Sequence, residues 1–158
     1  MKKFLRRSLL FVLFVGLPST YATYNIFQPE QFPIKFFRGE VVQVSDDIII
    51  GPYPTEKEIK RLKKMGIQEF ISLMNPSMPF ESPLIKKELE LAEKHKISFK
   101  NIPLSYLPDL ESMENLEKVE NLIAYTKGNK TKKYVHCYLG RHRTTLFKTY
   151  YLQSQNPS

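Results

Sequence analysis

Short apolar, β-branched runs alternate with amphipathic helical patterns along most of this chain, and this alternation limits its possible folds more than any other feature. Strand-like runs are predicted at 41–44, 48–50, 67–73, 97–104 and 133–135. Helical patterns begin near Thr55, Ser82 and Ser112, and a last helix is predicted from Thr144 onward. Strands that alternate with helices build a mostly parallel sheet with helices on its faces. The sequence therefore predicts a single α/β domain around one central sheet.

Local signals mark the ends of several of these helices. Residues 55–58 (TEKE) have the form of a capping box, and Gly66 is a suitable residue to end the helix that follows. Pro83 suits the first turn of the next helix. The helix from Ser112 is expected to carry a row of apolar side chains on one side: Met113, Leu116, Val119 and Ile123.

Composition fits one globular domain and excludes some kinds of partner. The chain has 158 residues, of which 42% are hydrophobic, and a net charge of +8 from 24 basic and 16 acidic residues. Four of the basic residues lie within the first seven, which leaves 20 basic against 16 acidic residues, or +4, for the rest. Because no basic stripe with interleaved aromatic residues is present, nucleic acid is not a predicted partner. The single cysteine rules out an internal disulfide.

The N-terminus has the three parts of a secretory signal peptide. A basic start, residues 1–7, precedes an unbroken apolar run at 9–17, and small residues before position 23 allow cleavage after Ala22. The alternative is a short membrane anchor formed by residues 8–22, with possible membrane association of the protein. The predicted organisation is a signal peptide or anchor at 1–22, a linker at 23–40 and a catalytic domain at 41–158. An exported protein, periplasmic or extracytoplasmic, is expected in either case.

The only cysteine, Cys137, lies where the last predicted strand meets the last predicted helix. Ligands of parallel α/β sheets bind beyond the carboxyl ends of strands. The amides of such a turn and the N-terminus of the helix make a concave site for an anion, and Gly140 allows a backbone angle that a side chain would resist. The same field favours the thiolate form of a cysteine. The loop therefore predicts a phosphate site with a sulfur nucleophile.

Each residue near the cysteine has an expected role in this chemistry. Arg143 can bind two phosphate oxygens at once and stabilise the transition state. The hydroxyl of Thr144 can donate to the sulfur, and His136 is expected to order the loop. The sulfur attacks phosphorus to give a phosphocysteine, which water then hydrolyses. The predicted phosphate-binding residues form one continuous loop: Tyr138, Leu139, Gly140, Arg141, His142 and Arg143.

Both steps of such a reaction need an acid or base on a loop at the same edge of the sheet. Asp109, in the loop after the strand predicted at 97–104, is the best candidate, and Glu111 is the second. Asp46 and Asp47 lie on an earlier turn and are weaker candidates. The alternative for Asp109 is a structural one, in which it caps the helix that begins near Ser112.

The pattern His136-Cys137-x-x-Gly140-x-x-Arg143-Thr144 resembles the HCxxGxxR[ST] loop of cysteine-dependent protein tyrosine and dual-specificity phosphatases. The sequence GRHRT at 140–144 is similar to the GKHRT of the atypical plant-and-fungal dual-specificity branch. The sequence GPYPT at 51–55 also resembles the early region of that family. The similarity covers residues 40–155. It implies a phosphatase fold, a thiolate mechanism without a metal or other cofactor, Cys137 as nucleophile, Arg143 as phosphate clamp and Asp109 as general acid.

Two departures from the family leave other functions open. Thr145 stands where the family commonly has glycine, and only 15 residues follow Arg143, which predicts a shortened C-terminal helical part. A catalytically inactive phosphate-binding module is therefore one alternative, and a rhodanese-like sulfur transferase is another. The expected substrates are phosphotyrosine, phosphoproteins, or inositol and lipid phosphates. Arg141 and His142 favour substrates with several phosphates, if they are not simply solvated loop residues.

Overall fold

The computed structural model describes residues 12–106 and 108–155, which belong to two compact units, Met1–Phe37 and Arg38–Ser158. The first unit contains a short π-helix, η1 (Val12–Gly16), followed by α2 (Leu17–Ile26) and α3 (Ile34–Phe37). Within the described ranges, no helix combines the length and the apolar character needed to cross a membrane. The basic start of the expected signal peptide lies outside the described residues.

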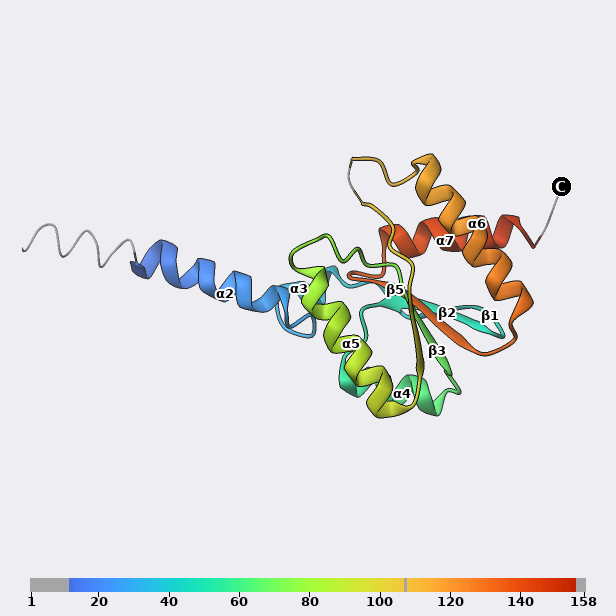
Figure 1. Cartoon of the computed structure of the whole chain (residues 1–158). Coiled ribbons are helices and arrows are strands. Elements are labelled where there is room, and N and C mark those ends of the chain that lie inside the picture. Colours follow the sequence, from blue (N-terminus) through green and yellow to red (C-terminus); the bar gives the residue numbers. More distant parts are fainter. Residues whose placement is uncertain (1–11, 107, 156–158) are drawn as a thin grey trace, which may run out of the picture. The chain divides into compact units, whose positions relative to one another are not determined.

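The second unit is built on a five-stranded sheet in the order β1-β2-β5-β3-β4 (Figure 1). Its strands, in chain order, are β1 (Val42–Ser45), β2 (Ile48–Pro52), β3 (Glu69–Ser72), β4 (Ser98–Asn101) and β5 (Lys133–Cys137). β1 pairs with β2 in the antiparallel sense, and the other pairings are parallel. Every residue of the inner strands β2, β3 and β5 is buried, as in a sheet covered on both faces. The predicted α/β class and mostly parallel sheet are confirmed.

Helices cover the two faces of the sheet in pairs (Figure 1). α4 (Glu56–Lys64) and α5 (Glu81–His95) pack over the face that carries Ile49, Phe70 and Tyr134. α6 (Met113–Gly128) and α7 (His142–Gln153) pack over the opposite face, with Ile50, Ile71 and Val135. Because successive strand residues point to opposite faces, each strand contributes to both cores.

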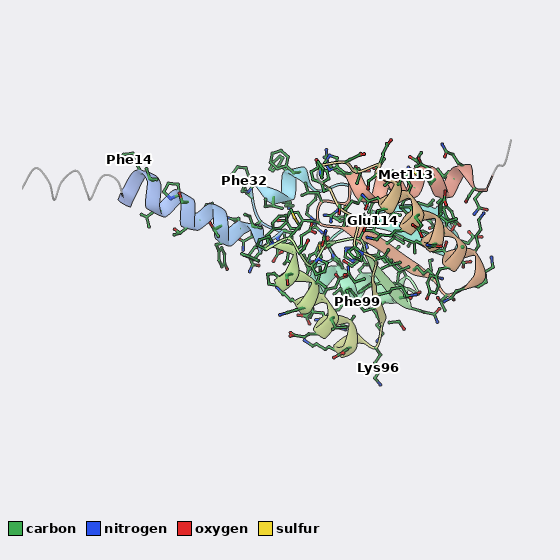
Figure 2. All side chains as sticks on the ribbon, turned by 45° about the horizontal axis from the view of Figure 1, so that its top comes forward. Phe14, Phe32, Lys96, Phe99, Met113 and Glu114 are labelled. Atoms are coloured by element: carbon green, nitrogen blue, oxygen red, sulfur yellow. The ribbon has the colours of Figure 1, made fainter. Side chains whose placement is uncertain are left out.

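Most of the local signals act as the sequence predicts. The hydroxyl of Thr55 accepts a hydrogen bond from the Glu58 amide, and the Glu58 carboxylate accepts one from the Thr55 amide, which is the capping box of α4. Gly66 has a positive φ of 87° just after α4. Lys96 ends α5 in the same left-handed region, with φ of 55°, and its side chain extends into solvent (Figure 2).

Several expected boundaries and faces differ from the structure. The strand predicted at 97–104 ends at Asn101, although the amides of Ile102 and Leu104 still donate to carbonyls beside them. Met113, expected to face the core, is 83% exposed in the first turn of α6 (Figure 2). α7 begins at His142 rather than at Thr144, because the helical turn already includes Arg143 and the amide of Thr145 donates to the carbonyl of Arg141.

Candidate active site

The turn between β5 and α7, residues 138–141, lies at the carboxyl end of a central strand. Gly140 has a φ of 68°, and a Cβ at this position would overlap the backbone of Gly51 and Pro52 at the end of β2. Only glycine satisfies both the positive φ and this close approach. The predicted need for glycine here is therefore explained by tertiary packing as well as by the turn.

Neighbouring segments hold the turn through its carbonyl groups. The amide of Gly39 donates to the carbonyl of Leu139 at 2.7 Å, and the amide of Tyr53 donates to the carbonyl of Tyr138 at 3.2 Å. Because other segments bind these carbonyls, the turn is suited to bind an anion through its backbone amides.

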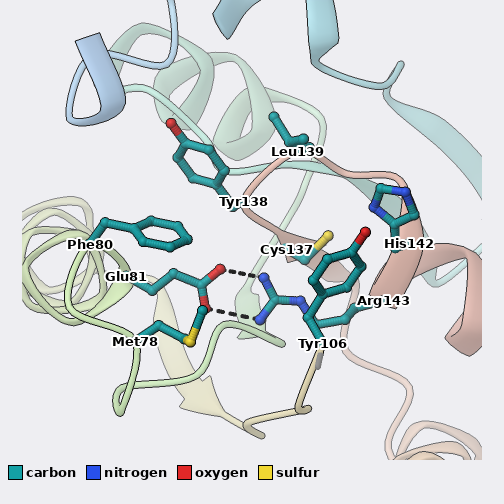
Figure 3. A pocket seen from close by; sticks show the side chains of 9 residues that line it. All are labelled: Met78, Phe80, Glu81, Tyr106, Cys137, Tyr138, Leu139, His142 and Arg143. Atoms are coloured by element: carbon teal, nitrogen blue, oxygen red, sulfur yellow. Dashed lines mark hydrogen bonds and ion pairs between the residues drawn. The ribbon is translucent and has the colours of Figure 1, made fainter. Parts of the chain in front are cut away.

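A cavity of about 150 Å³ opens at this turn (Figure 3). Its lining is mostly apolar and aromatic: Met78, Phe80, Glu81, Tyr106, Cys137, Tyr138, Leu139, His142 and Arg143. Cys137 is 3% exposed, so its sulfur lies deep in the cavity rather than at its mouth. Burial raises the pKa of Tyr138 to about 12, so that its phenol stays neutral beside a bound anion.

Arg143, in the first turn of α7, lies beside Cys137 and is almost fully buried (Figure 3). Nη1 donates to Oε2 of Glu81 at 2.9 Å and to the carbonyls of Leu73 at 3.1 Å and Leu104 at 3.4 Å. Nη2 donates to Oε1 of the same carboxylate. Burial by itself lowers the pKa of Arg143, but Glu81 and the Cys137 sulfur outweigh it and raise the pKa above its ordinary value. The guanidinium is thus charged and held in one orientation.

The partner of this arginine, Glu81, was not predicted from the sequence. It is 1% exposed at the start of α5, and its Oε2 also accepts a hydrogen bond from the Asn75 amide at 2.6 Å. α5 therefore begins one residue before the expected Ser82, with no side chain capping it. A glutamate in the first turn of a helix is usually explained by its favourable interaction with the helix dipole. No local sequence signal therefore reveals that Glu81 pairs with Arg143, 62 positions away.

Thr144 lies beside the sulfur, whereas the imidazole of His136 contacts α5 and makes no hydrogen bond to the loop that it was expected to order. Oγ1 of Thr144 lies 3.9 Å from Sγ of Cys137, within reach of a hydrogen bond to sulfur, and this side chain is fully buried. His136 is also fully buried, and its Nε2 lies 2.6 Å from Oε1 of Glu88 on α5. The two atoms are in close contact but do not have the alignment of a conventional hydrogen bond.

The structure places the candidate general acids in different parts of the molecule. Asp109 is exposed and does not line the cavity; its Oδ1 accepts a hydrogen bond from the Glu111 amide at 2.9 Å. It does not cap α6, because Ser112 takes that role. Asp46 and Asp47 lie away from the site, since the carbonyl of Asp47 bonds the amide of Lys133 at the far end of β5.

The predicted phosphate loop borders two hollows. Tyr138, Leu139, His142 and Arg143 line the small cavity with the cysteine. Gly140 and Arg141 line a wider, adjacent hollow, to which His142 also contributes. The remaining charged residues of this wider hollow are Arg38, Glu40 and Glu111. Over the described residues, no group of three or more His, Cys, Asp or Glu side chains could hold a metal ion.

No family model and no curated protein matches the chain by sequence, whereas solved structures do match it. A protein from Shewanella putrefaciens CN-32, assigned as a phosphatase of the DUF442 group, is 25% identical with a TM-score of 0.59; the match covers 75% of this chain and 74% of that one. The catalytic core of the PP-IP phosphatase SIW14 from S. cerevisiae is 16% identical with a TM-score of 0.59, over 77% and 69% of the two chains.

A third neighbour has a similar extent. A protein from Neisseria meningitidis Z2491, also assigned as a phosphatase, is 14% identical with a TM-score of 0.58, and the match covers 74% of this chain and 79% of that one. The Shewanella protein, at 25% identity, supports a phosphatase, in agreement with the loop motif, and the other two neighbours show the same fold. The predicted resemblance is confirmed: the chain shares its fold with the DUF442 phosphatase and with SIW14.

Proposed function

We propose that this protein hydrolyses phosphate monoesters through a phosphocysteine intermediate. The observation that carries the proposal is the convergence of Cys137 and Arg143 on one small cavity between β5 and α7. A thiolate at the bottom of an anion-binding turn is suited to attack phosphorus, and a fixed guanidinium is suited to neutralise the charge on the equatorial oxygens.

The reaction takes two displacements at phosphorus. Sγ of Cys137 forms a bond to phosphorus as the bond to the ester oxygen breaks, and the alcohol leaves with a proton from a general acid. Water then attacks phosphorus, the S–P bond breaks, and inorganic phosphate and the thiolate are released. The hydroxyl of Thr144 stabilises the departing sulfur by donating a hydrogen bond to it.

Asp109 remains our candidate for the general acid. It belongs to the loop that joins β4 to α6, and Tyr106, three residues earlier in this loop, lines the cavity. The change Asp109→Asn is expected to lower kcat for an alkyl phosphate by about 10²-fold or more. The loss for p-nitrophenyl phosphate should be much smaller, because p-nitrophenolate leaves without protonation. Equal losses with both substrates would remove Asp109 from the mechanism.

The lining of the cavity favours an aromatic phosphate such as phosphotyrosine. Phe80 and Tyr138 form an edge-to-face pair with centroids 5.6 Å apart, and Tyr106 lies against the ring of His142. Aromatic walls of this kind suit a flat ring that carries the phosphate into the site.

A polyphosphorylated small molecule is the second candidate substrate. His142 lines both the cavity and the adjacent hollow, where Arg141 is exposed. SIW14, a PP-IP phosphatase, is among the structural neighbours. Glu40 and Glu111 in the same hollow offset much of this positive charge, which is why we place the aromatic phosphate first.

The full chain should be assayed with p-nitrophenyl phosphate, phosphotyrosine peptides and inositol polyphosphates, beside Cys137→Ser. The serine variant is expected to lose activity by at least about a thousandfold, since the nucleophile is replaced. Rapid quenching with labelled substrate should trap a phosphorylated enzyme only when Cys137 is present. Hydrolysis that persists in Cys137→Ser would refute the mechanism, and tight phosphate binding without turnover in the parent would favour the inactive binding module.

We also propose that residues 1–22 direct the protein out of the cytoplasm. The basic start and apolar run support this proposal, as does the aromatic character of the segment that follows. Phe14, Tyr21 and Phe36 are exposed within the N-terminal unit, which suits a segment that meets lipid.

A further inference from the structure

A second buried carboxylate lies on α5, two turns after Glu81. Glu88 is fully buried, and its partner is His136, the residue directly before the nucleophile. Glu81 and Glu88 are seven positions apart, so they project from the same side of the helix. One helix face therefore contacts both the phosphate-binding arginine and the residue that precedes the cysteine.

Aromatic rings enclose the imidazole of His136. The ring of Tyr134 stacks on it with centroids 5.6 Å apart and an interplanar angle of 18°, and Tyr53 meets it edge-on at 6.2 Å. Both phenols are themselves anchored, because the Tyr134 hydroxyl donates to the carbonyl of Pro52 and the Tyr53 hydroxyl donates to the carbonyl of Leu84. The rings restrict how His136 can tilt, and the carboxylate of Glu88 determines where its Nε2 points.

Stability alone is a weak explanation for a polar pair in this place. Burying a carboxyl group and an imidazole away from water costs free energy, and apolar side chains of similar volume often stabilise a core equally well. Glu88 and His136 are each fully buried, so this cost applies to both groups. Such a pair is instead able to fix one orientation, which an apolar contact does not do.

We propose that Glu88 is a positioning residue for the Cys137 nucleophile. His136 and Cys137 are the last two residues of β5 and point to opposite faces of the sheet. The carbonyl of His136 accepts a hydrogen bond from the Leu73 amide at 2.8 Å. Anchoring His136 from α5 thus fixes the chain direction at the point where β5 enters the turn, and with it the place of Sγ relative to Arg143. This inference rests on the proposed function.

The test compares Glu88→Gln, which keeps the size but removes the charge, with Glu88→Leu and with the parent. Glu90→Gln is the matched control, because Glu90 is exposed on the same helix. In the full chain, kcat for p-nitrophenyl phosphate should fall by about 10- to 100-fold in the Glu88 variants, as when the group that orients a catalytic histidine is removed. KM should change little, since Arg143 keeps its own partner. Alkylation of Cys137 by iodoacetamide should also be slower, and the Glu90 control should match the parent.

Each outcome decides the question. A loss in kcat with slower alkylation, in a Glu88 variant that unfolds cooperatively, supports the positioning role. Parental kcat and alkylation in a folded Glu88 variant overturn it. If neither Glu88→Gln nor Glu88→Leu folds, the pair is a requirement of the core and the positioning role is also overturned. If the parent does not hydrolyse the ester, the proposed function fails, while the alkylation rates still test Glu88.

Discussion

At the scale of single residues, the site depends on buried charges that are paired across the fold. Arg143 and Glu81 are almost fully buried, and each satisfies the charge of the other. The end-on pairing uses Nη1 and Nη2 and fixes the plane of the guanidinium before any substrate arrives. A preorganised cation costs no reorganisation during the reaction. Glu81 therefore orients the arginine that the loop motif reveals.

This pairing makes a prediction for Glu81→Gln. The variant should lose about 3 kcal/mol of unfolding free energy, because a buried guanidinium loses its counter-charge. KM for p-nitrophenyl phosphate should rise, because the guanidinium is no longer held toward the phosphate. Urea unfolding and steady-state kinetics measure the two effects, with Glu93→Gln, an exposed position of α5, as the control. A Glu81→Gln protein as stable and active as this control would contradict the role given to the pair.

At the scale of elements, hydrogen bonds connect the start of α4 to the first residues of the second unit, Arg38–Ser158. Nη2 of Arg38 donates to Oε2 of Glu58 at 2.8 Å and to the carbonyl of Tyr53 at 2.9 Å. The same carboxylate completes the capping box with Thr55. The amide of Gly39, next to Arg38, donates a hydrogen bond to Leu139 in the turn between β5 and α7. One carboxylate thus stabilises a helix N-terminus and holds a segment that supports the turn.

Protonation of Glu58 should weaken this arrangement. Burial raises the pKa of this carboxyl, but hydrogen bonds from Arg38 and Thr55 outweigh burial and the pKa lies below its ordinary value. A lowered folded-state pKa means that the stability it contributes is present above the unfolded-state pKa and is lost as pH falls through the folded-state pKa. Glu58→Gln should therefore be less stable than the parent at neutral pH, and the difference should shrink in acid. Urea titrations at several pH values measure it; a difference that does not change with pH would contradict the assignment.

At the scale of the whole molecule, the sheet brings the site together from distant parts of the chain. β2 and β3 flank β5. The segment after β5 forms the turn, the segment after β2 supplies the Tyr53 amide that holds it, and the segment after β3 supplies Leu73 and Glu81 to Arg143. The N-terminal unit, Met1–Phe37, carries its own short helices and exposed aromatic side chains. The proposed phosphatase site thus lies in the second unit, and the proposed export segment lies in the first.

The proposed export can be tested on cells that express the full chain with a C-terminal tag. The protein is expected in the periplasmic or membrane fraction, because the basic start and the apolar run lie next to each other. Replacing Leu10 and Leu13 by Arg should retain the protein in the cytoplasm, since the apolar run is then interrupted by charge. A parent protein found only in the cytoplasm would rule out the proposal.

The sequence by itself determined the class of fold and indicated the residues of the candidate site. Periodicity depends on neighbours within a few positions, so the strands, the helices and the capping box at Thr55 follow from it. The order of residues from His136 to Thr144 indicates the proposed nucleophile and its arginine for the same reason. Only the tertiary structure revealed Glu81 and Glu88, because the partners of a buried charge are set by how α5 packs on the sheet. The tertiary structure also showed that Asp109 does not line the cavity, and no local sequence pattern predicts this position.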